Sequence, residues 1–288
     1  MLIESVKKLS PLDRLLYWIQ ERESIRLKKE AGEPVSWTDD AILQKYRFCN
    51  VRRMDDKVSR WLLENWYEPY FDHPNMLVAA VMARHFNLPD CLSKLGFPTK
   101  WDPNRIKHTA RKIKTSGGKV FSGAYMVRGM AKREPHWTAC KSDQVIDRVC
   151  QPIVDNPPVL SSNSMREAVE ALLPYWGFSS FMAGQVVADL RWAISGRWED
   201  RMVWAPLGPG SKRGLNRLYG FVAEAHQVEE EFRGMLDDTT EMLKKKVPAK
   251  ISSRLEAIDY QNCMCEFDKY SRALGGEGRP KQLYRGAT

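Results

Sequence analysis

A glycine- and proline-rich turn that leads into a cation-bearing segment is the first candidate for anion chemistry in this sequence. The stretch APLGPGSKRGLNRLYG, residues 205–220, ends in a helix-like pattern. Glycine lets a backbone approach a ligand closely, and the unpaired N–H groups of a helix N-terminus attract anions. We expect phosphate binding here by Gly208, Gly210, Ser211, Lys212, Arg213 and Arg217. A turn that merely caps a basic surface helix is the alternative.

Carboxylates crowd a second segment, LEAIDYQNCMCEFDKYSRALGGEGRPK, residues 255–281. Asp259, Asn262 and Glu266 are spaced by three and four residues and so share one face of a helix. Such a face can line a cleft, with carboxylates as general bases and an amide that holds a base edge. We expect proton transfer by Glu266, Asp268 or Asp259. Salt-bridged surface charge remains the alternative.

Cations and aromatic residues are interleaved in a third segment, residues 38–66. This composition engages phosphates and stacked or flipped bases. Trp61 and Trp66 are expected to pack in the core. The residues expected to contact DNA are Asn50, Arg52 and Arg53, together with Lys269.

A glycine-containing hairpin follows in LLPYWGFSSFMAGQVVADLRW, residues 172–192. Two helices joined through Gly177, with small residues early in the second helix, resemble the helix-hairpin-helix element of DNA glycosylases. In that element backbone N–H groups bind a DNA phosphate without reading sequence. Gly177 is therefore a DNA-binding candidate, and Asp189 is a further candidate for proton transfer. An ordinary helical corner is the alternative.

The charge balance favours a polyanionic partner. The chain has 288 residues, with 45 Lys and Arg against 36 Asp and Glu, a net charge of +9 and a pI near 9.2. We expect this excess to be spread over solvated helix faces. Nucleic acid is favoured over a membrane surface, because no basic helix carries a long apolar face. No apolar run approaches the ~20 residues of a bilayer span, and the N-terminus lacks the apolar core of a signal peptide.

Cysteine and histidine are scattered rather than paired. The six cysteines show no C-x-x-C spacing, and the five histidines are equally scattered. We therefore expect reduced, mostly buried thiols and no metal site.

Helical periodicity dominates the chain and predicts an all-α fold. One helix begins at Pro11 and ends before Gly32 and Pro34, and others are expected around residues 55–68 and 75–87. Residues 120–127, VFSGAYMV, are the single ambiguous piece. Further helices are expected at 103–115, 139–151, 165–173, 179–194, 212–236 and 251–272.

The expected organisation is a helical domain with short extensions. Residues 1–34 form an N-terminal helix, and residues 35–275 form a domain of two lobes with a polar, proline-bearing loop near 152–164. Residues 276–288 are expected to form a basic, loosely ordered tail.

Five ordered motifs together resemble one family, the alpha-glutamyl/putrescinyl thymine pyrophosphorylases, or phage amino acid:DNA transferases. That family is related to the helical domain of 5-hydroxymethyluracil DNA kinases. The resemblance covers residues 35–285. The motifs are DDAILQKYRFCNVRRMDDKVSRWL, GGKVFSGAYMVRG, GFSSFMAGQVVADL, GPGSKRGLNRLYG and NCMCEFDKYSR.

The resemblance implies a DNA glycosylase-like helical bundle that acts in thymine hypermodification. The implied reaction replaces the phosphate or pyrophosphate of a modified 5-hydroxymethyluracil in double-stranded DNA by an amine from an amino acid or polyamine. Base extrusion in such proteins needs no cofactor, and we expect none. A virus-encoded enzyme of this kind is expected in the host cytoplasm.

Two departures narrow the expected function. The sequence has no G-x-x-x-x-G-K-[ST] motif, which argues against ATP-dependent kinase activity. Lys212 or Arg213 stands roughly where a glycosylase carries its catalytic aspartate, which argues against glycosidic cleavage. A non-catalytic DNA-binding module that partners a kinase and a modified-base glycosylase remain the alternatives.

Overall fold

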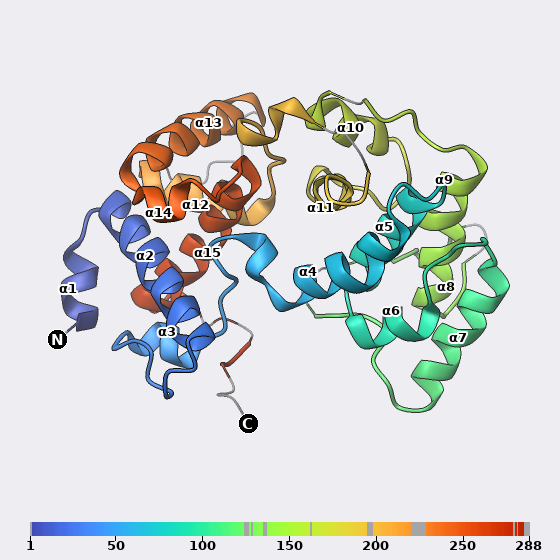
Figure 1. The fold of residues 1–288 in the computed structure, drawn as a ribbon, viewed down its shortest axis with the longest axis horizontal. Coiled ribbons are helices and arrows are strands. Elements are labelled where there is room, and N and C mark those ends of the chain that lie inside the picture. The colour runs from blue at the N-terminus through green and yellow to red at the C-terminus, as the bar shows by residue number, and fades with distance from the viewer. Residues whose placement is uncertain are drawn as a thin grey trace. The chain divides into compact units, whose positions relative to one another are not determined.

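The described residues of the computed structural model are helical, which confirms the expected all-α class (Figure 1). The residues described are 2–123, 127, 129–134, 137–161, 163–194, 198–220, 229–278, 280 and 282–284. Within them no strand forms, and a single bridge joins Tyr46 to Leu283. In the same part of the chain, no helix is both long enough and apolar enough to cross a membrane.

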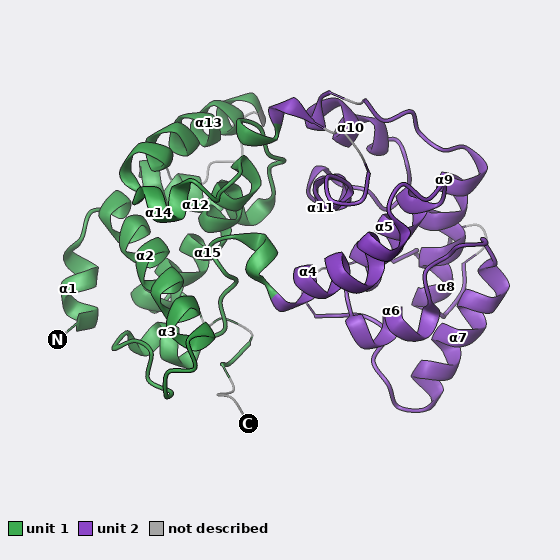
Figure 2. Ribbon diagram, viewed as in Figure 1, with its two compact units in different colours: residues 1–56, 201–288 green, residues 57–200 purple. Residues whose placement is uncertain are grey.

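The chain divides into two compact units (Figure 2). Unit 1 joins Met1–Asp56 to Arg201–Thr288, and unit 2 is Lys57–Asp200. The division therefore falls near residues 56 and 200, and the 152–164 interval lies inside unit 2. The N-terminal helix shares unit 1 with the C-terminal third of the chain.

Unit 1 is built around its last helix. Its elements are α1 Leu2–Lys8, α2 Pro11–Glu30, α3 Ala41–Lys45, the 3-10 turn η1 Arg53–Asp55, α12 Pro209–Tyr219, α13 Glu229–Lys246, α14 Ala249–Ser252 and α15 Ala257–Gly275. Tyr260, Phe267 and Tyr270 of α15 are fully buried together with Trp18 of α2. Figure 1 shows α15 lying among α2, α3 and α12.

Unit 2 is centred on α5 and α11. Its elements are α4 Lys57–Leu62, the π-helical turn η2 Leu63–Tyr67, the 3-10 turn η3 Glu68–Tyr70, α5 Met76–Phe86, α6 Pro89–Leu95, α7 Pro103–Thr115, α8 Lys141–Val145, the π-helical turn η4 Ile146–Cys150, α9 Gln151–Asp155, α10 Met165–Leu172 and α11 Ser180–Leu190, with the 3-10 turn η5 Glu199–Met202 at the boundary. Every residue from Val78 to Phe86 is buried, and α5 packs against α11, which is buried from Met182 to Leu190.

Most expected helices form close to their expected bounds. The helix that begins at Pro11 is capped by Ser10, whose hydroxyl accepts a hydrogen bond from the Asp13 N–H at 3.1 Å. The expected helix 212–236 is wrong as one element, because α12 ends at Tyr219 and Gly220 adopts a left-handed conformation with φ +75°. Residues 221–228 and 124–126 lie outside the described part of the chain.

The described part of the C-terminal tail pairs with an earlier segment of unit 1. The Arg47 N–H donates to the Gln282 carbonyl at 3.1 Å, and the Tyr284 N–H donates to the Lys45 carbonyl at 2.9 Å. The Tyr284 ring meets Trp37 edge-on at 6.2 Å. Residues 282–284 are thus fixed by backbone hydrogen bonds rather than loose, while residues 285–288 lie outside the description.

Glycine spacing in α12 allows an unusually close approach to α15. A Cβ on Gly214 would lie 2.1 Å from the Met264 carbonyl oxygen, and one on Gly210 would lie 2.9 Å from the Cys265 Sγ. No real Cβ atom lies as close to a carbonyl oxygen as the first of these distances. The second distance is also too short for a Cβ, and the Cys265 side chain that it meets is held in the interface between the two helices. Glycine at these two positions therefore sets the distance between the two helices.

Replacing Gly214 by alanine is expected to destabilise unit 1. The clash with the Met264 backbone forces the helices apart at a cost of about 2–3 kcal/mol, more than the ~1 kcal/mol that alanine gains over glycine in a helix. Urea unfolding followed by circular dichroism measures the difference.

Gly234→Ala is the matched control, because Gly234 is exposed in α13 and its Cβ would meet nothing within 4 Å. This variant should gain about 0.5–1 kcal/mol. Equal effects of the two substitutions would contradict the close-approach argument.

Candidate functional site

The N-terminus of α12 is closed by its own serine. The Gly208 N–H donates to the Ser211 hydroxyl at 2.9 Å, and that hydroxyl donates to the Gly208 carbonyl at 2.9 Å. Ser211 is fully buried, and Gly210 packs on Cys265. The first turn is therefore held rigidly against α15, and the Ser211 hydroxyl is engaged in the helix cap.

Three arginines converge on one buried carboxylate beside this turn. Asp268 is 1% exposed and accepts hydrogen bonds from the Nε atoms of Arg217 at 2.7 Å, Arg213 at 3.0 Å and Arg272 at 3.2 Å. Glu277 adds a second acid, because its Oε2 accepts from Arg217 Nη2 at 2.5 Å. The cluster of Arg213, Arg217, Arg272, Asp268 and Glu277 therefore keeps one positive charge in excess.

The arginines keep Asp268 ionised. Burial alone would raise its pKa, but the hydrogen bonds from Arg217 and Arg213 and the charge of Arg272 bring the pKa below its usual value. Glu277, hydrogen-bonded to Arg217, also has a lowered pKa. Arg213 is the most exposed of the three arginines, with 52% of its side chain accessible. Asp268 thus holds the Arg213 guanidinium through its Nε while the side chain stays half-exposed to solvent, an arrangement suited to anion binding.

Lys212 is directed to a different side of α12. Its Nζ lies 5.2 Å from the centroid of the Phe232 ring on α13, within cation–π range. Lys212 and Arg213 are adjacent in sequence, so they leave the same helical turn in different directions.

The polar face of α15 holds an extended segment, residues 47–53, along the helix. The Glu266 Oε2 accepts from the Cys49 N–H at 3.0 Å, and the Lys269 Nζ donates to the Arg47 carbonyl at 2.5 Å and to Glu266 at 3.0 Å. The Asn262 amide donates to the Asn50 carbonyl at 3.4 Å. The expected common face thus exists, and its carboxylate and amide bind backbone of the same chain.

Asp259 completes this attachment at the start of α15. Its Oδ1 accepts from the Arg53 N–H at 2.8 Å, and its Oδ2 accepts from the Glu256 N–H at 2.9 Å. Asp259 is 1% exposed, so both carboxylate oxygens are used inside the protein. It is a helix cap that also fixes the position of Arg53.

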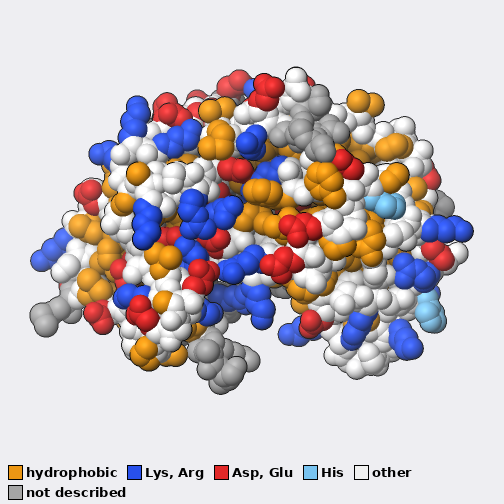
Figure 3. Space-filling view, in the orientation of Figure 1, with side chains coloured by type: hydrophobic (Ala, Val, Ile, Leu, Met, Phe, Trp, Pro, Cys, Tyr) orange, Lys and Arg blue, Asp and Glu red, His pale blue; other side chains and the backbone are white. Residues whose placement is uncertain are grey.

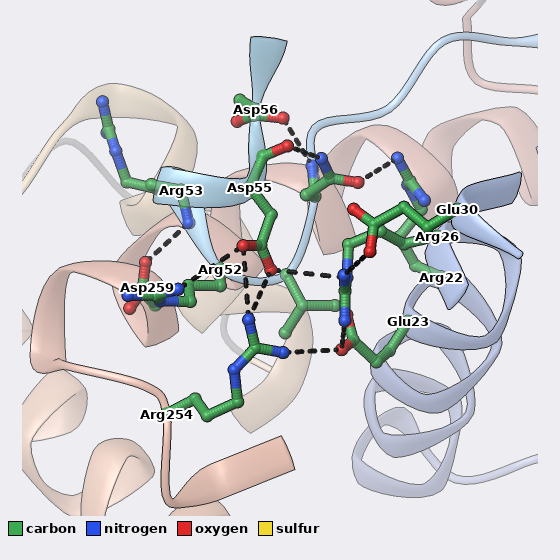
Figure 4. A network of polar contacts seen from close by, with 12 residues as sticks. Arg22, Glu23, Arg26, Glu30, Arg52, Arg53, Asp55, Asp56, Arg254 and Asp259 are labelled. Atoms are coloured by element: carbon green, nitrogen blue, oxygen red, sulfur yellow. Dashed lines mark hydrogen bonds and ion pairs between the residues drawn. The ribbon is translucent and has the colours of Figure 1, made fainter. Parts of the chain in front are cut away.

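A charge network next to this segment joins α2, η1 and the turn between α14 and α15 (Figure 4). Arg26 donates to Glu23 and Glu30 and lies 3.3 Å from Asp55, which Arg254 also approaches at 3.3 Å. Asn50 accepts from Arg22 at 2.5 Å and donates to the Asp55 carbonyl at 2.6 Å. The two amide atoms of Asn50 are therefore used within the fold. Arg52 contributes a weaker pair to Asp55 at 3.5 Å.

Asp56 is a site candidate that the sequence analysis missed. Its Oδ1 accepts from the Asn50 N–H at 2.9 Å, and burial raises its pKa to about 6 against the lowering effect of that N–H and of Arg53 and Arg22. A half-buried carboxyl whose pKa is raised to about 6 is suited to general-base work. The pair Asp55–Asp56 reads in sequence only as acid at a helix start, so no sequence signal distinguished it.

Arg53 links Asp56 to the arginine cluster electrostatically within unit 1. Figure 4 shows the Arg53 guanidinium and the Asp56 carboxylate on the same side of the network. Arg53 and Arg213 both lower the pKa of Cys265, which burial and Glu266 raise to about 12. Arg53 therefore lies within electrostatic range of Asp56 on one side and of the thiol beside Arg213 on the other.

The remaining candidates lie in unit 2. Asp189 forms a buried bidentate ion pair with Arg84, at 2.5 and 2.6 Å, and accepts from the Tyr67 hydroxyl at 2.7 Å. Gly177 lies in the turn between α10 and α11 with φ +91°, and its Cβ would lie 2.8 Å from Val149 Cγ2, so the turn requires glycine. The helix pair expected there is present, with Gly177 at its corner.

No metal site accompanies these groups. In the described ranges, no three His, Cys, Asp and Glu side chains are arranged to hold a metal ion. The six cysteines are unpaired thiols.

Asp268→Asn is expected to destabilise unit 1, because it removes the counter-charge of three arginines. Since these arginines are partly solvated, we expect a loss of about 2–3 kcal/mol at pH 7 in urea unfolding. The pKa of Asp268 is lowered in the folded state, so its stabilisation is present above its ordinary pKa and is lost as the pH falls through the lowered one. The variant and the wild type should therefore converge in acid.

Glu277→Gln serves as the control for Asp268→Asn, because Glu277 bonds the same Arg217 but has 53% of its side chain exposed. We expect a change below about 0.5 kcal/mol. A loss as large as that of Asp268→Asn would show that the buried carboxylate is not the centre of the cluster.

Comparison with known proteins places most of the chain in a family. Residues 10–279 match the family described as 5-hmdU DNA kinase, helical domain. The 5-hmdU DNA kinase of Bacillus phage SP10 is 27% identical over 228 residues, which cover 71% of this chain and 36% of the kinase. The chain thus spans about a third of the length of this relative, and no solved structure matches it. The relation to the kinase helical domain that the sequence motifs predict is confirmed. The chain belongs to the family of 5-hmdU DNA kinase helical domains.

Proposed function

We propose that this chain is an amine:DNA transferase in phage thymine hypermodification, acting on phosphorylated 5-hydroxymethyluracil in duplex DNA. The observation that carries the proposal is the Arg213 guanidinium, exposed at the start of α12 and anchored by buried Asp268. Family membership supports 5-hydroxymethyluracil as the nucleobase of the substrate, since the phage relative is named as a 5-hmdU DNA kinase. This sequence has no phosphate-binding loop, and we assign it the step after phosphorylation.

The proposed reaction exchanges one bond for another at the 5-methylene carbon. The carbon–oxygen bond breaks, and the phosphate or pyrophosphate leaves with the electron pair, which gives an electrophilic exocyclic methylene on the pyrimidine. An amino acid or polyamine, after its ammonium has given a proton to a base, adds its nitrogen lone pair to that carbon. The protein must extrude the base, bind the leaving phosphate and accept the proton.

We assign the leaving phosphate to Arg213, with Arg217 and Lys212 supplying further positive charge. Two guanidiniums held by one buried carboxylate are pre-organised and lose little freedom when they bind an anion. In this proposal Gly208, Gly210 and Ser211 act by fixing the first turn of α12. The Ser211 hydroxyl does not bind the phosphate, because it is engaged in the helix cap.

We assign proton acceptance to Asp56, with Glu266 as its neighbour. The raised pKa of Asp56 makes it a stronger base near pH 7 than Asp268, because the arginines lower the pKa of Asp268. Asp259 and Asp189 use both oxygens in internal bonds, so in this proposal they act through structure. Arg52, Arg53 and Lys269 remain proposed DNA contacts. Asn50 acts by holding the backbone of residues 47–53, and Gly177 acts by shaping the turn between α10 and α11 of unit 2.

A second candidate function is a DNA-binding helical module that partners a kinase. It is favoured by the alignment of this chain with only 36% of the phage kinase. A modified-base glycosylase with the proposed helix-hairpin-helix fold is the third. One assay separates them: the protein is incubated with phosphomethyluracil-containing duplex DNA and a pool of amino acids and polyamines, and the DNA is digested for mass spectrometry. An amino-linked nucleoside supports transfer, a released base supports excision, and unchanged DNA leaves binding.

In that assay, Lys212→Ala combined with Arg213→Ala is expected to lower turnover by about a hundredfold or more, because the leaving charge loses its donors. Asp268 keeps Arg217 and Arg272, so the fold should persist. Lys245→Ala with Lys246→Ala removes the same charge from the exposed end of α13 and should leave turnover unchanged. Full activity of the first double variant would refute the phosphate assignment.

The pH dependence tests the base. The plot of kcat/KM against pH should fall on the acid side with a midpoint near pH 6, because protonated Asp56 cannot accept a proton. Asp56→Asn should remove this limb and lower kcat by about 10²–10⁴-fold. Asp39→Asn, an exposed aspartate of the same unit, is the control. An unchanged limb in Asp56→Asn would assign it to another group.

A further inference from the structure

We infer that α7 and the turn that follows it form a second, electrostatic DNA-binding surface, located on unit 2, whereas the arginine cluster belongs to unit 1. The inference rests on DNA being the substrate in the proposed function and adds the surface that holds the duplex. Its ligand is the phosphate backbone of double-stranded DNA, recognised by charge without base reading.

The excess of positive over negative charge in this protein is concentrated in one segment. Residues 100–141 carry eleven Lys and Arg but only two acids, Asp102 and Glu134, and so hold a net charge of +9. The rest of the chain holds 34 Lys and Arg and 34 Asp and Glu, and is neutral. The expectation of an excess spread along the chain is therefore wrong. The whole net charge of the protein lies in this segment.

The fold turns this charge outward. Ile106, Ala110 and Ile113 bury one face of α7, at 5% exposure or less. The exposed positions of α7 and of the turn after it are Asn104, Arg105, His108, Arg111, Lys112, Lys114, Thr115, Ser116, Gly117, Gly118 and Lys119. Figure 3 shows Lys and Arg side chains gathered over α7, at the lower right of the view.

Few of these cations are neutralised. Lys107 pairs with Asp147 at 2.8 Å and Arg111 pairs with Asp143, whereas Asp102, the one acid of residues 100–119, caps the helix through the Arg105 N–H. Within the described ranges, Lys112, Lys114 and Lys119 have no acid within ion-pair distance. None of these three lysines is therefore neutralised by an ion pair within those ranges.

The turn after α7 brings these three lysines to one end of the helix. The Gly117 N–H donates to the Lys114 carbonyl and the Gly118 N–H donates to the Ile113 carbonyl, at 3.1 and 2.9 Å. The chain therefore reverses at once, and Lys119 stays beside the last turn. Lysines in the last turn of a helix are also stabilised by the helix dipole, but that effect is worth only about 0.3–1 kcal/mol each. It would operate equally if the lysines had acidic partners.

The test measures binding of a fluorescent 30-base-pair duplex of ordinary thymine-containing DNA, by anisotropy between 0.05 and 0.3 M NaCl. The triple variant Lys112→Ala, Lys114→Ala, Lys119→Ala should bind about ten- to a hundredfold more weakly at 0.1 M salt. The slope of log K against log salt should fall by about 2–3, because three fewer phosphates are neutralised. Circular dichroism melting checks that the variant is folded.

Two matched variants complete the design. Lys245→Ala, Lys246→Ala, Lys250→Ala removes the same charge from exposed positions of unit 1 and should change neither affinity nor slope. The replacement of Lys112, Lys114 and Lys119 by arginine keeps the charge and should keep binding. Equal losses in both alanine triples, no loss in the first, or no binding by the wild type would overturn the inference.

The outcome is independent of the chemistry proposed for unit 1. The probe contains no phosphorylated base, so a failed transferase assay with intact, α7-dependent binding refutes only the transferase. Turnover with unchanged binding in the α7 triple variant refutes only the surface.

Discussion

The burial of three carboxylates on α15 is the constraint on which unit 1 depends. Asp259, Glu266 and Asp268 lie on one nineteen-residue helix and are each at most 8% exposed. A buried charge is tolerated only when donors surround it. Asp259 and Glu266 obtain theirs from the backbone of residues 47–53, and Asp268 obtains its own from arginines of α12 and α15. Satisfying these charges fixes where the N-terminal segment and α12 must lie.

The close contact between α12 and α15 follows from the same requirement. Gly210 and Gly214 let the helices approach until Arg213 and Arg217 reach Asp268 through Nε. The Arg213 side chain stays half-exposed, whereas the outer end of the Arg217 guanidinium is bonded to Glu277. The glycines of this turn were expected to admit a phosphate to the backbone. In the structure they admit a neighbouring helix, and they bring the cations into place by doing so.

Charge is used in two ways in this protein. In unit 1 acids and bases are matched, as in the network of Arg26, Glu23, Asp55 and Arg254, and the outcome is a fixed geometry with a carboxyl of raised pKa at its edge. At the end of α7 and in the turn after it, Lys112, Lys114 and Lys119 have no acidic partner within the described residues, and the outcome is a positive electrostatic field. A matched network orients groups for chemistry, whereas an unmatched surface attracts a long polyanion and tolerates its motion.

The sequence by itself determined the helical class, most helix bounds, the family and the common face of Asp259, Asn262 and Glu266, because periodicity, caps and motif order are local properties. It also contained the charge of residues 100–141. It did not determine the groups that α15 binds, since residues 47–53 are about two hundred positions away in the chain. Only the tertiary structure decided that Ser211 closes a cap, that Asp189 pairs with Arg84 and that Asp56 has a raised pKa. These properties depend on burial and on distant partners, which no local pattern encodes.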